Sequence, residues 1–410
     1  MSRMKPPSLV SSFCESLELN KKDFFAFLLL YFSSANWYAV TTQVLPHALS
    51  VYLKGAPVLW ASFGFDFLIA LSMFVAGLLI EGRSRLAFLR FSAISAIFLT
   101  LMLPLASTVE SVVLLMSFLG VPAGFTSLAL AILFAEKTFA RERGRIAGAM
   151  VALAIFTSPA VIILSRSFSL VWALGVLIAL NFIVVILSFV IRDLEVQRQI
   201  GRQRALGGFG KNYFLYFIAW ALVSSTNGFF SSVFDVYVES FREMVQLGFV
   251  LQYVTACVMA WIGGFLMDWY GRKPLILLGL AFFGVSMSLL ALASNPIAYS
   301  LIWATNGGSW GLFLPTFYLF IWGEAATGQV RALAYSLGLM VFHLARSLGF
   351  LAFPYLSQHE PIGLALVSSS VVFLGSVPLV LAHETLPSDE RQALRFSRYL
   401  SRVREEVERQ

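Results

Sequence analysis

Three ionisable side chains lie inside long apolar stretches of this sequence: Asp66, His343 and Arg346. Charged groups within an apolar helix are costly, and they usually face a partner or a water-filled path. A carboxylate, an imidazole and a guanidinium at one place could pass a proton and hold an anion. They could equally form a permanent structural ion pair, and the residue types alone leave both interpretations open.

The composition indicates where these groups are held. The chain is 59% hydrophobic and 12% charged, with a mean hydropathy of +0.81, whereas a soluble domain carries about 25% charged residues. Most of the chain must therefore face lipid or a protein interior within lipid. The net charge of +7 does not indicate nucleic-acid binding, because the Lys and Arg residues cluster in loops between apolar runs. Cys14 and Cys257 give no disulfide framework.

A membrane-spanning helix needs roughly 20 apolar residues, and the sequence predicts twelve. They are expected near 24–48, 57–80, 86–106, 110–136, 144–165, 168–191, 213–236, 245–268, 274–294, 296–323, 331–356 and 361–382. The predicted fold class is an all-α integral membrane protein with two six-helix bundles, 1–191 and 213–387. A polar linker, 192–212, separates them, and 388–410 forms a tail helix. No cleavage pattern precedes the first span, which we expect to be retained.

The basic residues predict the orientation. One set of loops holds most of them: Arg83, Arg85, Arg90, Lys137, Arg141, Arg143, Arg145, Arg192, Arg198, Arg202, Arg204, Lys211, Arg272, Lys273 and Arg331. The other set holds Lys54, Arg166 and Arg242. Positive charge marks the cytoplasmic side, so both termini are expected in the cytoplasm of a plasma-membrane protein. The tail stripe of Phe396, Leu400, Val403 and Val407 fits a helix on the membrane surface or a solvated helix.

Polar and glycine residues recur between the halves at offsets of 187 to 191 positions. The matched sets are Gly77, Glu81 and Arg85 with Gly264, Asp268 and Arg272; Glu136 and Arg143 with Glu324 and Arg331; and 33–36 with 224–227. The first copy of the turn is degenerate, because Ser84 replaces the glycine. These three matched sets, at nearly the same offset, predict duplicated bundles around a central pathway.

The turn after the eighth span resembles the loop signature G-x-L-a-D-r-x-G-r-k of the major facilitator superfamily of transporters. The matching residues are Gly264, Leu266, Asp268, Gly271, Arg272 and Lys273. Glu324, Arg331 and Ala334 also resemble the E-x-F-P-x-x-x-R-G-x-A pattern of the sugar-porter and metabolite–proton symporter branches, although the Phe-Pro pair is absent. The segment 383–385 is similar to the Pro-Glu-Thr of those branches.

The resemblance implies a cytoplasmic gate in which carboxylates and arginines of the two halves pair. The implied members are Gly77, Glu81, Arg85, Glu136, Arg143, Gly264, Asp268, Gly271, Arg272, Glu324 and Arg331. The simpler alternative is that these charges act as topology signals and helix caps.

The resemblance also places the second and eleventh helices face to face across the halves. Asp66 and Arg346 each lie about nine residues from the outer end, roughly 13 Å deep. We therefore expect them to meet, with His343 one turn from Arg346. The first, seventh and tenth spans are expected to line the cavity. Their candidate residues are Asn36, Gln43, His47, Ser224, Asn227, Ser231, Asn306, Ser309 and Trp310. Interhelical hydrogen bonding is the alternative role.

Missing motifs narrow the function. Met116 stands where the proton-linked motif of the family has an arginine, and Ser158-Pro159 lacks the antiporter signature Gly-Pro-x-x-Gly-Gly. The sequence has no phosphate-binding G-x-x-x-x-G-K-[ST] and no histidine spacing for a metal, so we expect neither a cofactor nor a metal.

The preferred function is a secondary transporter that works by alternating access, with proton-coupled uptake of a small polar or anionic metabolite. Its expected partners are lipid, a small solute and protons, and we expect a monomer that binds no nucleic acid. Efflux of a drug or metabolite is the alternative of the same class. A membrane-embedded enzyme or a non-transporting sensor is the alternative of another class. The sequence shows no nucleophile–base or metal set, so we expect no enzyme.

Overall fold

A computed structural model describes residues 19–49, 53, 55–80, 83–167, 169–191, 209–238, 245–291, 296–326, 330–358 and 361–387, together with 389, 403 and 407. All regular structure within these ranges is helical. Three predictions lie largely outside them: the role of Glu81, the linker 192–212 up to residue 208, and the tail helix 388–410.

The first half contains six membrane-spanning segments, two of which are divided. Its helices are α2 (Lys21–Gln43) continued by α3 (Leu45–Ala48), α4 (Ala56–Leu79), α5 (Arg85–Met102) with a short 3-10 turn (Leu103–Leu105), α6 (Val109–Phe118) continued by α7 (Gly120–Lys137), α8 (Arg143–Ser167) and α9 (Leu170–Val190).

The second half repeats the pattern, with breaks in its tenth and twelfth segments. Its helices are α10 (Lys211–Val238), α11 (Val245–Tyr270), α12 (Arg272–Ala291), α13 (Pro296–Phe313), the π-helix η4 (Leu314–Phe320), α14 (Ile321–Ala325), α15 (Arg331–Leu356), α16 (Pro361–Leu374) and α17 (Ser376–Leu381).

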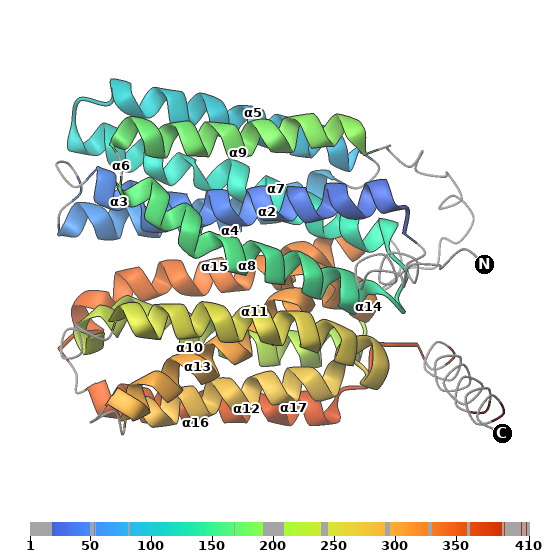
Figure 1. Ribbon diagram of the computed structural model, residues 1–410. Helices are drawn as coiled ribbons and strands as arrows, with labels where there is room; N and C mark the ends of the chain where they lie inside the picture. Colours follow the sequence, from blue (N-terminus) through green and yellow to red (C-terminus); the bar gives the residue numbers. More distant parts are fainter. Residues whose placement is uncertain are drawn as a thin grey trace, which may run out of the picture.

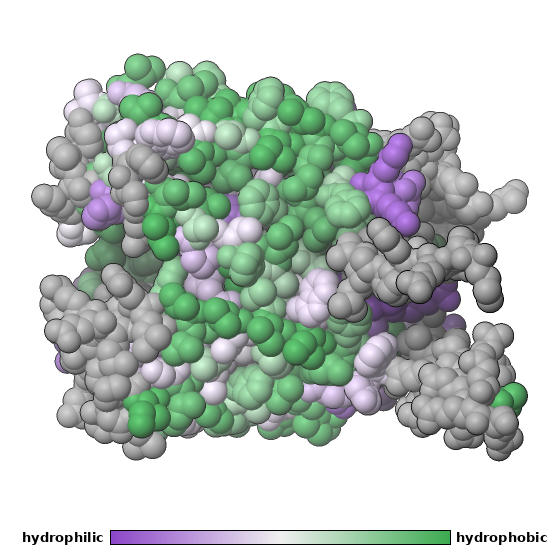
Figure 2. Space-filling view, in the orientation of Figure 1, coloured by the Kyte–Doolittle hydropathy of each residue, from purple (hydrophilic) through white to green (hydrophobic). Residues whose placement is uncertain are grey.

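Ten of the described helical segments are long and apolar enough to cross a membrane. The other two of the twelve predicted segments are α10, with 28 residues, and the broken unit from α13 to α14. Large hydrophobic side chains face outward, such as Phe91 at 61% and Phe98 at 59% exposure. Figure 2 shows this apolar surface across the middle of the molecule, with hydrophilic side chains gathered toward the ends. The chain is therefore a multi-pass membrane protein.

Local chemistry sets the helix boundaries. Ser84 accepts a bond from the Ala87 N–H at 3.3 Å and caps α5, while Thr108 and Ser111 form a capping box at α6. Gly271 separates α11 from α12 with a φ of +106°, a left-handed conformation that favours glycine. The predicted turn is thus confirmed at Gly271.

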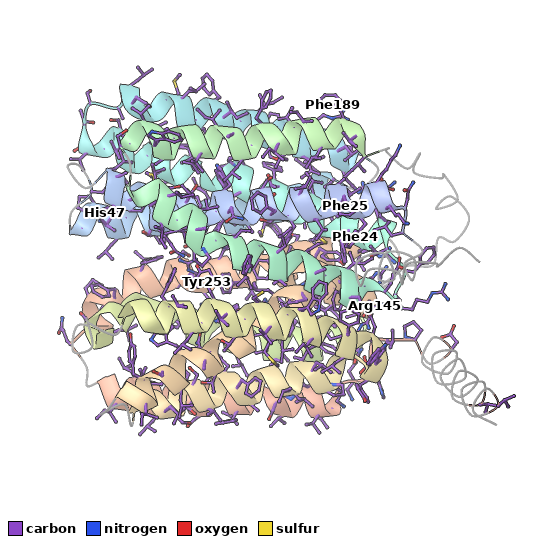
Figure 3. The ribbon with its side chains drawn as sticks, viewed as in Figure 1. Phe24, Phe25, His47, Arg145, Phe189 and Tyr253 are labelled. Atoms are coloured by element: carbon purple, nitrogen blue, oxygen red, sulfur yellow. The ribbon has the colours of Figure 1, made fainter. Side chains whose placement is uncertain are left out.

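The two halves lie side by side along their length (Figure 1), and they meet through α4 against α15 and α8 against α11. One end of the molecule, called the basic end below, holds Arg85, Arg143, Arg145, Arg272 and Lys273. Figure 3 shows Arg145 toward this end and His47 at the opposite end.

The glycine contacts reveal the register of the internal repeat. A Cβ added to Gly120 would lie 2.2 Å from the Phe65 carbonyl oxygen, and one added to Gly307 would lie 2.2 Å from the Gln252 carbonyl oxygen. Both members of the second contact follow those of the first by 187 positions. The same backbone approach therefore occurs once in each half, at the offset that the sequence motif predicted.

Candidate functional site

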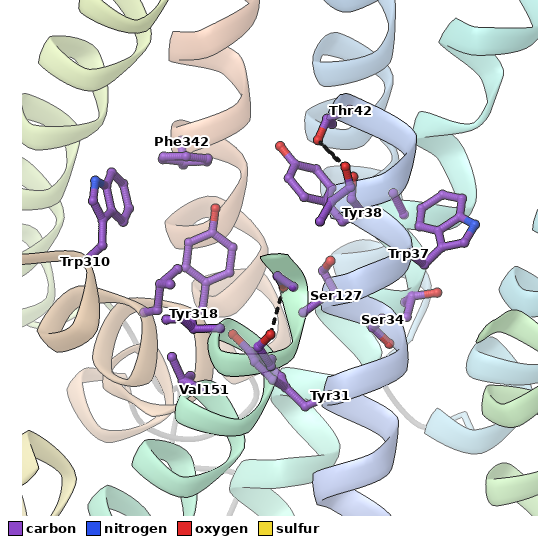
Figure 4. A pocket seen from close by; sticks show the side chains of 18 of the residues that line it. Tyr31, Ser34, Trp37, Tyr38, Thr42, Ser127, Val151, Trp310, Tyr318 and Phe342 are labelled. Carbon is purple, nitrogen blue, oxygen red and sulfur yellow. Dashed lines mark hydrogen bonds between the residues drawn. The ribbon is translucent and has the colours of Figure 1, made fainter. Parts of the chain in front are cut away.

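A cavity of about 520 Å³ lies between the two halves. Its lining is largely aromatic and apolar, with a few polar side chains (Figure 4). The aromatic members are Tyr31, Trp37, Tyr38, Phe249, Tyr253, Trp310, Tyr318 and Phe342. Such a concave, mostly apolar lining with few polar groups is typical of a small-molecule site.

The three ionisable groups of the spans meet beside this cavity. Asp66 Oδ1 lies 2.7 Å from His343 Nδ1, and Asp66 Oδ2 lies 3.7 Å from Arg346 Nε. The Asp66 side chain is 1% exposed, whereas His343 and Arg346 reach the cavity wall. The predicted meeting of Asp66 and Arg346 is therefore observed, with the carboxylate behind the two basic groups.

Packing between the halves creates this cluster. Helix α4 supplies Asp66 and α15 supplies His343 and Arg346, and these two helices pack against each other across the halves. From α2, the Tyr38 hydroxyl accepts a hydrogen bond from Arg346 Nη1, and its ring lies 5.8 Å from the His343 ring. Three helices thus hold one carboxylate and one guanidinium at the cavity, and any movement between the halves must alter their contact.

The predicted polar lining is correct for some residues. Gln43, Asn227 and Trp310 line the cavity, as predicted. Gln43 Nε2 also lies 3.4 Å from the Tyr253 hydroxyl, a contact from α2 to α11 that crosses the halves.

Two asparagines do not line the cavity and take the alternative role, interhelical hydrogen bonding. Asn36 is fully buried and donates to the Phe32 carbonyl and to Thr157 Oγ1 at 2.9 and 3.2 Å. Its side chain is directed toward α8 and is not part of the cavity wall. Asn306 accepts a 2.7 Å bond from Gln252, and only Gln252 of the two reaches the cavity wall.

Sequence reasoning missed the tyrosines. Tyr31 and Tyr38 line the cavity on α2, and Tyr318 reaches it from the π-helix η4. The spacing of seven residues between Tyr31 and Tyr38 places both on one helical face, which was an available signal. No sequence signal marked η4.

A buried charge network closes the basic end. Asp268 on α11 accepts hydrogen bonds from the Gly144 and Arg145 backbone N–H groups at 2.8 and 2.9 Å. Its carboxylate also lies 3.2 Å from Arg145 Nε and 3.0 Å from Arg272 Nη1. Because α8 belongs to the other half, Asp268 ties the halves together at the N-terminus of α8, where a negative charge is stabilised by the helix dipole.

Glu324 forms the second link at this end. Its carboxylate lies 3.4 Å from Arg143 in the first half and 3.3 Å from Arg272 in its own half. Arg272 is fully buried and also donates to the Ala140 carbonyl of the first half. Thr385 donates to Glu324 at 2.9 Å, which extends the network beyond the last span.

Only some of the predicted gate residues form ion pairs between the two halves. Arg85 pairs with Glu136 at 2.8 Å inside the first half, so this copy does not link the halves in the present structure. Arg331 begins α15 with an exposed side chain and makes none of the ion pairs described above. Arg145 and Glu384 were missed. Glu384 accepts from the Arg272 and Lys273 N–H groups at 2.9 and 3.1 Å and caps α12.

Backbone contacts reinforce the closure. A Cβ on Gly264 would lie 2.4 Å from the Gly144 carbonyl oxygen and 3.0 Å from Gly148 Cα. Where α4 meets α15, a Cβ on Gly77 would lie 2.4 Å from Ser336 Cβ. Both predicted glycines therefore lie where the two halves touch.

Solved structures decide the fold. Comparison of the sequence with protein-family models and with curated proteins gives no match. The proton:xylose symporter XylE of the major facilitator superfamily superposes with a TM-score of 0.69 at 14% identity, over 90% of this chain and 98% of that chain. The present chain has the major facilitator superfamily fold.

Two further structures share this superfamily fold. The human organic anion transporter MFSD10 (TETRAN) gives a TM-score of 0.69 at 10% identity, over 88% of this chain and 99% of that chain. A bacterial homologue of the iron transporter ferroportin, in an outward-facing state with soaked iron, gives a TM-score of 0.65 at 17% identity, over 88% of this chain and 99% of that chain. At these identities the superfamily fold is established, and the branch is not resolved. Within the described residues, no group of three or more His, Cys, Asp or Glu side chains could hold a metal ion.

Proposed function

We propose that this protein is a secondary transporter that works by alternating access and couples uptake of a small organic anion to a proton. The observation that carries the proposal is the cluster of Asp66, His343 and Arg346 between the two halves. The superfamily fold supports transport, and two of the matched structures are described as a proton:xylose symporter and an organic anion transporter.

The cluster offers a physical route to coupling. Arg346 reaches the cavity and also lies 3.7 Å from the Asp66 carboxylate, so an incoming anion competes with Asp66 for one guanidinium. When the anion takes Arg346, the buried carboxylate loses that positive partner and binds a proton instead. His343, 2.7 Å away, gives the proton a path from the cavity to Asp66. By linkage, the proton in turn favours the anion.

The charge network supports the second element of the proposal. In this structure the basic end is sealed by Asp268, Glu324 and their arginines, and Figure 2 shows the surface recessed between the halves at the opposite end. Positive charge marks the cytoplasmic side of membrane proteins. We therefore assign the basic end to the cytoplasm and the present structure to an outward-facing state.

Uptake into proteoliposomes tests the proposal. Organic acids that raise the melting temperature of the purified protein are used as labelled substrates, with and without an imposed proton gradient. Asp66→Asn is expected to keep exchange of substrate but to lose accumulation driven by protons, and Arg346→Gln is expected to lose both. Arg90→Gln is the matched control, because Arg90 bonds Ser188 at 2.8 Å on α9, away from the cavity. Proton-driven accumulation that survives both cluster substitutions would overturn the coupling scheme.

A further inference from the structure

Part of the cavity lies within the first half, on the side of α2 that faces away from the second half. This part, called the side chamber below, is lined by Ser34 and Trp37 of α2, Ala96 of α5, Thr126 and Ser127 of α7, and Asn181 of α9. Figure 4 shows Ser34 and Trp37 on the side of α2 away from Trp310, Tyr318 and Phe342. Since α5 and α9 pack together on the side of the first half away from the second, the side chamber is a deep branch of the cavity.

The internal repeat shows that this space is specific to the first half. At the offset of 187 positions set by the glycine contacts, Ala96 corresponds to Phe283 and Thr126 to Phe313. Phe283 and Phe313 pack edge to face, with ring centroids 6.3 Å apart. Ala123, which also lines the cavity, corresponds to Trp310, whose ring lies 6.2 Å from Phe283. In the second half, three aromatic rings thus occupy the space that corresponds to the side chamber. In the first half, smaller residues at the equivalent positions leave that space open.

Two residues of the side chamber carry buried polar atoms without hydrogen-bond partners, Ser34 and Trp37. Within the described part of α2, four buried side-chain polar atoms have no hydrogen-bond partner: Ser33 Oγ, Ser34 Oγ, Asn36 Oδ1 and Trp37 Nε1. Of these four residues, Ser34 and Trp37 line the cavity. Trp37 is 5% exposed and lines the cavity. Buried polar groups are nearly always paired, so this concentration points to a ligand.

The available groups define what would bind. The Trp37 indole N–H is a donor and requires an acceptor. Asn181 uses its amide nitrogen on the Leu177 carbonyl at 2.9 Å, which leaves its amide oxygen as an acceptor. Ser34 can donate or accept. No charged side chain lines the side chamber, and a hydroxyl is the small neutral group that both accepts and donates.

We propose that the side chamber binds a hydroxyl group of the transported solute, which makes the substrate class a hydroxylated organic anion. The anionic group lies at Arg346, and the aromatic wall between holds the body of the molecule. The anion part rests on the proposed function, whereas the hydroxyl part rests on the side chamber alone.

Matched ligand pairs test the assignment. The purified full-length protein is titrated with carboxylates that differ by one hydroxyl: benzoate and 4-hydroxybenzoate, phenylacetate and 4-hydroxyphenylacetate, and phenylacetate and mandelate. We expect wild type to bind the hydroxylated member of at least one pair about fivefold more tightly, the value of one hydrogen bond. Trp37→Phe keeps the ring and removes the N–H, so it should abolish that preference. Trp172→Phe is the control, because Trp172 is 58% exposed on α9.

Two further variants separate the possible failures. Ala96→Phe introduces the residue found at the equivalent position in the second half and should also remove the preference; Ser34→Ala provides the same test without added volume. Melting temperature without ligand shows that each variant is folded. A hydroxyl preference that persists in Trp37→Phe and Ser34→Ala, or its absence in wild type across all pairs, overturns the proposal. Undiminished carboxylate binding by Arg346→Gln overturns the anion site of the proposed function instead.

Discussion

Substitution of Gly264 by Ala should shift the protein toward a state that is open at the basic end. The added Cβ would lie 2.4 Å from the Gly144 carbonyl oxygen, whereas an ordinary van der Waals contact of a Cβ atom begins at 3.4 Å. Helices α8 and α11 must therefore separate by about 1 Å. Overpacking of this kind costs about 1–3 kcal/mol, which changes the ratio of two conformations about 5- to 150-fold. The cost falls on the state closed at the basic end, because each helix belongs to a different half.

Thiol labelling measures this shift. A cysteine is placed at Leu130, a buried residue of the cavity wall, in a background with Cys14 and Cys257 replaced by Ser, and a membrane-impermeant maleimide is added from the basic side. Gly264→Ala should be labelled several times faster than its parent. Gly175→Ala is the control, because a Cβ there meets nothing within 4 Å. Equal labelling of Gly264→Ala and Gly175→Ala would refute the inference that α8 and α11 seal this end.

Three substitutions at the basic end should lower stability to different extents. Thermal unfolding and the same labelling assay measure the effect of each. Asp268→Asn should lower stability strongly and speed labelling, since breaking a buried ion pair costs about 3–5 kcal/mol. Asp23→Asn is its control and should change stability and labelling little, because the Asp23 carboxylate lies 4.0 Å from Lys137 Nζ. Glu384→Gln weakens the cap of α12 and should cost about 0.5–2 kcal/mol of stability. Gly271→Ala should destabilise the protein, because Gly271 has a φ of +106°. Gly363→Ala should not, because a Cβ added there meets nothing within 4 Å. Similar melting temperatures for the members of either matched pair would contradict the assigned contacts.

The sequence predicted the features that depend on local chemistry. Long apolar runs can span a membrane only as helices, so their number and order gave the fold class. Gly271 was recognisable because few residues tolerate a positive φ. Asp66 and Arg346 were paired by their equal depth on two helices that the resemblance to the superfamily placed face to face, where two costly charges are expected to meet.

Features that depend on helix rotation and side-chain volume were not predictable from spacing. Asn36 and Asn227 are equivalent in the repeat, yet Asn227 lines the cavity and Asn36 bonds Thr157 on α8. Arg145 meets Asp268 because α8 begins at that point, a detail set by packing between the halves. The side chamber depends on the small volume of Ala96, whose equivalent in the second half is Phe283 in the register set by the backbone contacts.

The central claim is that the two halves exchange which end of the cavity is sealed. Paired spin labels at exposed positions measure it directly, with Phe139 and Trp269 for the basic end and Trp60 and Ile297 for the opposite end. As pH is lowered in the presence of an organic anion that binds, the distance across one end should increase while the other decreases. Distances that stay fixed at both ends, or that change in the same direction, would contradict alternating access in this protein.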